Sequence, residues 1–188
     1  MDKHAVAQAR DRLNKATAYS AALGGTNDVS TVLALWGDFL IAAGGVYSKL
    51  EQGAKGYSKS TPWFAAKKAQ RTRDPLLSYL QQARNAEEHG ITPPHRWKAS
   101  SITIPPGGHA WLRGDGKNWH VEDPTPGVAP NNPEAVLEAV KNRGVEFQPP
   151  SEHLGEPIED GSPAGMARLA MAYLTALVSE AEALVQQK

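Results

Sequence analysis

The sequence predicts a mainly α-helical protein, an up-down bundle of four to five helices with a small antiparallel β-sheet inserted before the last helix. Long segments at both ends carry apolar residues at three- and four-residue spacing. A capping residue followed by proline, a common helix start, occurs at Thr61-Pro62, Asp74-Pro75 and Ser162-Pro163. Most prolines lie within residues 91–161. We therefore expect a single domain, with the bundle in residues 1–90 and 162–188 and the sheet in residues 91–161.

Two long helices are expected at the start of the chain. The first covers residues 2–23 and has a modest apolar stripe, and Gly24-Gly25 ends it. The second covers about residues 28–52, and its wide apolar stripe places it at the centre of the bundle. The Gly44-Gly45 pair inside it lowers helix propensity, and we expect it to let another helix approach closely rather than to serve a functional role.

Two shorter helices follow, from Pro62 to about Arg73 and from Asp74 to Gly90. Asp74 is a suitable N-cap for the second, and Gly90 suits the left-handed position after its end. Because Asp74 precedes a proline, it is biased away from helical geometry. We therefore expect the two helices to meet at an angle.

The proline-rich segment is expected to form short strands. Ser100–Ile104 alternates like a strand, and His109–Arg113 with Asn118–Glu122 predicts a hairpin. Pro133–Arg143 has the spacing of a short helix, and Val145–Gln148 predicts a further strand. The tryptophans of this segment are expected to be packing anchors, with base stacking as the alternative for the last two: Trp97, Trp111 and Trp119. From Ser162-Pro163 a long amphipathic helix runs to the end of the chain.

Composition limits the possible functions. The 188 residues contain 20 basic and 20 acidic side chains, so no overall charge favours DNA or a membrane. The absence of cysteine excludes disulfides and thiolate metal sites. The six histidines show no metal-ligand spacing, and no phosphate loop or nucleophile elbow is present. We expect a soluble, cytoplasmic protein without a metal or other cofactor.

The strongest candidate site is the last turn of the 74–90 helix. Arg84 and Glu88 lie four residues apart and so share one face of the helix, as do Asn85 and His89. The helix dipole favours a cation at this end, which would stabilise the charged form of His89 for proton transfer near neutral pH. The same turn is also typical of an exposed helix end, where an Arg–Glu pair contributes little to stability.

A run of basic residues precedes this helix. It comprises Lys67, Lys68, Arg71 and Arg73. Such a run is commonly a solvated helix face. The alternative is a phosphate-binding strip that leads directly into the candidate site.

The hexapeptide Arg84-Asn85-Ala86-Glu87-Glu88-His89 resembles the R-x4–6-H motif of the HEPN superfamily, in which such a motif lies in a helical bundle. An asparagine directly after the arginine is a frequent form of that motif. Many HEPN domains are metal-independent ribonucleases that act as dimers, often as toxins or defence effectors, and others have lost activity. The sheet insertion and the balanced charge depart from the usual pattern.

The resemblance implies that two copies of the chain supply two histidines and two arginines to one site. His89 of one copy would accept the proton of the RNA 2′-hydroxyl, and His89 of the other would protonate the leaving oxygen. Arg84 would hold the phosphate, Asn85 would orient His89 or bind the phosphate, and Glu88 would hold Arg84 until substrate arrives. The implied partners are a second copy, RNA, and an antitoxin or regulatory protein.

Two other functions stay open. The chain could be a non-catalytic helical module that binds a nucleotide, RNA or a protein partner, with the insertion making the recognition. It could also be a small-molecule enzyme that uses polar residues of the insertion, among them His109, Asp115, His120 and Glu122.

Overall fold

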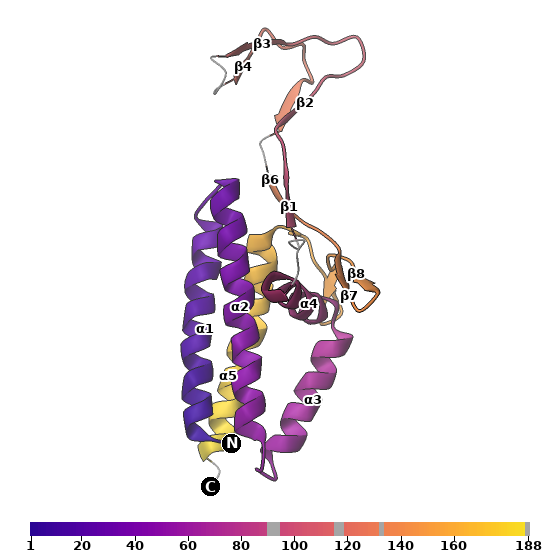
Figure 1. Cartoon of the computed structure of the whole chain (residues 1–188). Helices are drawn as coiled ribbons and strands as arrows, with labels where there is room; N and C mark the ends of the chain where they lie inside the picture. Colours follow the sequence, from indigo (N-terminus) through magenta and orange to yellow (C-terminus); the bar gives the residue numbers. More distant parts are fainter. Residues whose placement is uncertain (90–94, 115–118, 132–133, 187–188) are drawn as a thin grey trace. The chain divides into compact units, whose positions relative to one another are not determined.

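The computed structural model describes residues 1–89, 95–114, 119–131 and 134–186. The described chain is mainly helical, with short antiparallel strands before the last helix, as predicted (Figure 1). Its five helices are α1 (Lys3–Gly24), α2 (Val29–Ala54), α3 (Ser60–Arg73), α4 (Pro75–His89) and α5 (Pro163–Gln186).

Two of the predicted helix starts are confirmed. The Asp74 carboxylate accepts a hydrogen bond from the Leu77 N–H at 2.8 Å, and the Ser162 hydroxyl accepts one from the Gly165 N–H at 3.1 Å. Each satisfies a backbone donor that the first turn leaves unpaired. Asp74 is extended, with φ −78° and ψ 123°, so α3 and α4 meet at an angle as predicted (Figure 1).

The predicted cap at Thr61 is wrong. Helix α3 already begins at Ser60, and the Thr61 hydroxyl instead donates to the Ala54 carbonyl at 2.9 Å. The end of α2 leaves carbonyl groups without a helical partner, and this bond satisfies one of them. The predicted stop at Gly90 falls outside the described residues.

Helix α2 contributes the largest share of the core. It packs along α1 and also contacts α4 and α5, and its largest fully buried side chain is Trp36. Helix α1 and α2 lie side by side with α5 next to them (Figure 1). By length and composition α2 could span a membrane, a property that core helices of water-soluble proteins share, and most of its apolar stripe is buried against these helices.

The chain divides into two compact units. One comprises residues 1–96 and 135–188, and the other residues 97–134. The ladder of β1 (His95–Lys98) and β6 (Glu134–Leu137) is where the chain passes from one unit to the other. The strands form separate two-stranded ladders among the described residues, rather than one sheet.

The larger unit contains two antiparallel hairpins that contact α4. They are β7 (Val140–Asn142) with β8 (Val145–Phe147), and β9 (Glu152–His153) with β10 (Glu156–Pro157). Both turn residues of each hairpin have positive φ: Arg143 and Gly144 in the first, Leu154 and Gly155 in the second. Two-residue hairpin loops of this kind match the twist of the strands.

The predicted helix over Pro133–Arg143 is therefore wrong. The described part of this stretch, from Glu134, forms β6 and β7. Its alanines and valines have the spacing of an amphipathic helix, but the turn at Arg143-Gly144 pairs β7 with β8, and strand pairing prevails over local spacing.

The smaller unit holds two further antiparallel ladders. Strand β2 (Ser101–Thr103) pairs with β5 (Ala129–Asn131), and β3 (Trp111–Gly114) pairs with β4 (Trp119–Glu122), which confirms the predicted hairpin. Trp111 is 67% exposed, so the prediction that it anchors the packing is wrong. A hairpin of two short strands offers no second layer to cover the ring. The side chains of Trp97 and Trp119 lie outside the described residues.

Two buried tyrosines predict how stability responds to alkaline pH. Burial raises the pKa of Tyr47 and of Tyr79. The neighbouring Tyr173 raises the pKa of Tyr47 further, and the charge of Glu138 does the same for Tyr79. Both folded-state pKa values lie above the unfolded value of about 10, so the unfolded chain releases these protons first. The free energy of unfolding is thus unaffected below about pH 10 and falls above it, by about 1.4 kcal/mol per pH unit for each tyrosine.

Urea unfolding at a series of pH values measures this slope. Tyr79→Phe should remove about half of the tyrosine contribution to the slope, because one of the two groups no longer titrates. An unchanged slope in Tyr79→Phe would contradict the assignment.

Candidate functional site

Arg84 lies in the last turns of α4, half-buried, where Glu88 holds it. One guanidinium nitrogen of Arg84, Nη2, contacts both carboxylate oxygens of Glu88, at 2.6 Å and 2.8 Å. Nη1 donates to the Asn85 side-chain oxygen at a longer 3.4 Å. The predicted pairing of Arg84 with Glu88 on one helix face is confirmed. The polar end of the guanidinium is therefore fixed, whereas its Nε is buried without a hydrogen-bond partner among the described residues.

A glycine on the neighbouring helix makes room for this arginine. A Cβ atom at Gly44 of α2 would lie 3.2–3.3 Å from Cγ, Cδ and Nε of Arg84. The expectation for the Gly44-Gly45 pair was the close approach of another helix, and the group that contacts Gly44 is the side chain of the candidate arginine. An alanine at this position would displace the Arg84 stem.

Arg84 lines a cavity of about 200 Å³ whose lining residues come from α2, α3, α4 and α5. Its floor is apolar, from residues such as Leu40, Leu77 and Leu174. Its polar groups come from Tyr47, Ser48, Glu51, Arg71, Gln81 and Asn85. A cavity smaller than the roughly 300–1,000 Å³ of drug-sized ligand sites suits a phosphate group or a small metabolite rather than a whole nucleotide.

Arg71 reaches the same cavity from α3. Its guanidinium carbon lies 4.2 Å from the centre of the Tyr47 ring, a cation–π contact. Its Nε is buried without a hydrogen-bond partner, and the described residues include no carboxylate within ion-pair distance of it. Burial lowers the pKa of Arg71, and the opposing attraction of Tyr47 and Glu51 is weaker.

The structure does not gather the other predicted basic residues at this cavity. Lys67 bonds Glu180 of α5 at 2.7 Å, and Lys68 bonds Glu51 of α2 at 3.2 Å. Arg73 is exposed and borders a different surface hollow near Asp74 and the β9–β10 turn. The run therefore divides among several faces, because successive positions of a helix point in different directions. The His89 side chain lies outside the described residues.

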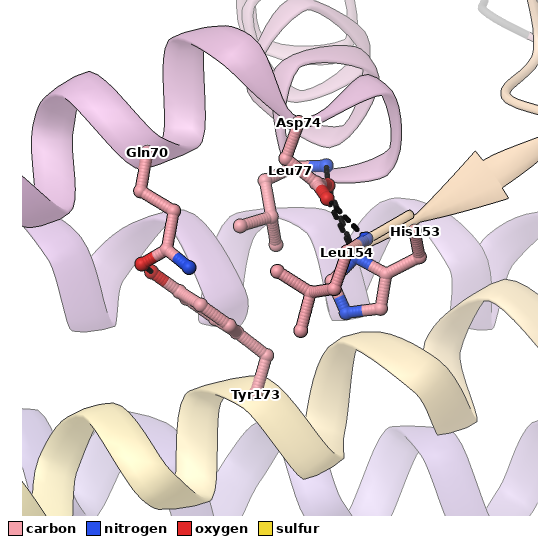
Figure 2. A network of polar contacts seen from close by, with 6 residues as sticks. All are labelled: Gln70, Asp74, Leu77, His153, Leu154 and Tyr173. Atoms are coloured by element: carbon pink, nitrogen blue, oxygen red, sulfur yellow. Dashed lines mark hydrogen bonds and ion pairs between the residues drawn. The ribbon is translucent and has the colours of Figure 1, made fainter. Parts of the chain in front are cut away.

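A buried pair that the sequence analysis did not single out joins α4 to the β9–β10 hairpin. The ring nitrogen Nδ1 of His153 lies 3.0 Å and 3.1 Å from the two carboxylate oxygens of Asp74, and the Leu154 N–H donates to the same carboxylate at 2.7 Å (Figure 2). Asp74 and His153 are almost entirely buried. Their positions are 79 residues apart, so only the cap role of Asp74 was predictable.

This pair serves the fold. The Asp74 carboxylate accepts from the first turn of α4, from the hairpin backbone and from His153, so its oxygens are fully engaged. The His153 ring lies edge-on to the Tyr173 ring of α5, with ring centres 6.1 Å apart (Figure 2). The Tyr173 hydroxyl donates to the side-chain oxygen of Gln70 of α3 at 3.1 Å. The strained positive φ of Leu154 is held in place by its bond to Asp74.

Within the described ranges, no group of three histidine, aspartate or glutamate side chains is arranged to hold a metal ion. Two carboxylates near Arg84, those of Glu51 and Glu88, are paired with Lys68 and Arg84. No protein-family model, no curated protein and no solved structure matches this chain. The geometry of the site places two arginines at one small cavity.

Proposed function

We propose that this chain is a metal-independent endoribonuclease of the HEPN type, possessing the up-down helical bundle of that class. In this proposal Arg84, Asn85 and His89 act at an interface between two copies of the chain. The single observation that supports it is the placement of Arg84, a half-buried guanidinium held by Glu88 beside a second arginine in a small cavity. Such a pair suits the phosphate of RNA.

The chemistry needs a base, an acid and a cation. In the proposed mechanism His89 of one copy takes the proton of the 2′-hydroxyl, which then attacks the adjacent phosphorus. His89 of the second copy protonates the leaving 5′-oxygen. Arg84 stabilises the negative charge that develops on the phosphate, and Glu88, which holds Arg84 in the free protein, releases it to substrate. A toxin or defence role, with an antitoxin as partner, belongs to this proposal.

A second function is favoured by one specific observation. The Arg84 guanidinium is already engaged by Glu88, and Trp111 stands exposed on the β3–β4 hairpin. An exposed tryptophan can stack on a base or anchor a protein partner. In this alternative the chain binds RNA, a nucleotide or a protein without cleaving it.

The test is incubation of the purified protein with mixed RNA in the presence of EDTA. We expect cleavage products that end in a cyclic phosphate, and a loss of at least about 100-fold in rate for His89→Ala and for Arg84→Ala. Arg168→Ala is the control, because Arg168 is exposed, lies on α5 and does not line the cavity. Its rate should equal that of the wild type.

The outcomes separate the two functions. Absence of cleavage by the wild type, or equal rates for wild type and His89→Ala, would remove the nuclease proposal. Binding of RNA without cleavage, weakened by Trp111→Ala, would support the binding module. Sedimentation of the wild type tests the second copy that the mechanism requires, and a strictly monomeric protein that still cleaves RNA would overturn the two-copy mechanism.

A further inference from the structure

We propose that the cavity between Arg71 and Arg84 is a binding site for a phosphate monoester carrying a small hydroxylated skeleton, and that Arg71 is its principal cation. This inference goes beyond the proposed nuclease: Arg71 takes no step in the proposed cleavage, although its place beside Arg84 supports that proposal. Of the residues in the cleavage mechanism, Arg84 and Asn85 also line this cavity.

The first argument is the state of Arg71. The guanidinium is held against the Tyr47 ring at 4.2 Å, and among the described residues it forms no ion pair, while Nε is buried without a hydrogen-bond partner. Taking a charged group out of water is unfavourable unless an opposite charge or acceptor compensates it. A bound anion would supply that compensation, because Arg71 lines the cavity and Tyr47 contacts only the flat face of its guanidinium.

The second argument is the convergence of a second arginine. Arg84 lines the same cavity, its Nε is also buried without a partner in the described part of the chain, and its Nη2 is held by Glu88. Two planar guanidinium groups with unused donors suit the several oxygens of a phosphate better than the two oxygens of a carboxylate.

The third argument concerns what the phosphate is attached to. The cavity volume of about 200 Å³ accommodates a phosphate with a short carbon skeleton. Glu51 and Ser48 also line the cavity, and Glu51 is partly neutralised by Lys68 at 3.2 Å. A carboxylate and a hydroxyl next to the arginines suit ligand hydroxyl groups, so a sugar phosphate or the phosphorylated end of an RNA shares the required chemistry.

The experiment is isothermal titration of the full-length protein with three probes: inorganic phosphate, ribose phosphate and an RNA oligonucleotide with a terminal phosphate. We expect binding of ribose phosphate and a weakening of about 10- to 100-fold in Arg71→Gln. Arg71→Lys should also weaken binding, because it retains the charge and loses the planar donor edge. Arg168→Gln, at an exposed arginine of α5 that does not line the cavity, should bind like the wild type.

Thermal unfolding without ligand checks that each variant is folded. If Arg71→Gln does not fold, Arg71→Lys serves as the test. Tight binding of the RNA end with weak binding of ribose phosphate would assign the site to nucleic acid, and the reverse would assign it to a free sugar phosphate. Equal affinity of wild type and folded Arg71 variants, or no binding of any probe, would overturn the inference. Because these titrations measure no cleavage, phosphate binding without nuclease activity refutes only the proposed function.

Discussion

Replacing Asp74 with alanine is expected to lower the free energy of unfolding by about 3–5 kcal/mol. The carboxylate accepts from the Leu77 N–H, the Leu154 N–H and the His153 ring at 2.7–3.1 Å in a nearly dry environment. Its removal takes away the cap of α4 and leaves donors from the hairpin buried without an acceptor. Urea unfolding followed by circular dichroism measures the loss.

Asp28→Ala is the matched control for this change. Asp28 caps α2 through a 2.8 Å bond from the Thr31 N–H, in the same way that Asp74 caps α4, but it is exposed and contacts no hairpin. We expect a clearly smaller loss than for Asp74→Ala. The loss for Asp74→Asn should lie between the losses for Asp28→Ala and Asp74→Ala, because an amide retains one acceptor oxygen while its nitrogen cannot accept. Equal losses at Asp28 and Asp74 would show that only the cap matters and that the His153 pair contributes nothing.

Trp36→Ala is expected to destabilise the protein by about 3–5 kcal/mol, because it opens a cavity in the most buried part of α2. Trp36 has no exposed surface and stacks on Phe39 with ring centres 5.7 Å apart. Since a domain of this size is stable by only about 5–15 kcal/mol, this loss is a large part of its free energy of unfolding. The midpoint and slope of a urea transition measure the effect.

Trp36→Phe distinguishes packing from polarity at the same position. The indole Nε1 of Trp36 is buried without a hydrogen-bond partner among the described residues. Phenylalanine removes this unsatisfied donor and retains most of the ring, so we expect a loss below about 1.5 kcal/mol. A loss in Trp36→Phe as large as that in Trp36→Ala would show that the indole nitrogen has a favourable role.

The helices and their starts were predictable because their signals are local. Apolar spacing identified α1, α2, α4 and α5, and the proline at position 62 indicated α3. Side chains at Asp74 and Ser162 satisfy the backbone donors that a helix start leaves open. The pairing of Arg84 with Glu88 follows from helical geometry alone. The prediction of a helix over Pro133–Arg143 is wrong because its signal was only local. The spacing was helical, but strand pairing across a turn decided the structure.

The mainly helical class and the polar turn that contains Arg84 follow from local patterns of residues, since both depend on neighbours a few positions apart. The packing of distant elements places Arg71 and Arg84 at one cavity, the Arg84 stem against Gly44, and His153 on Asp74. These contacts join residues from different elements. Their distances depend on how helices and hairpins pack, which no local pattern of residues encodes.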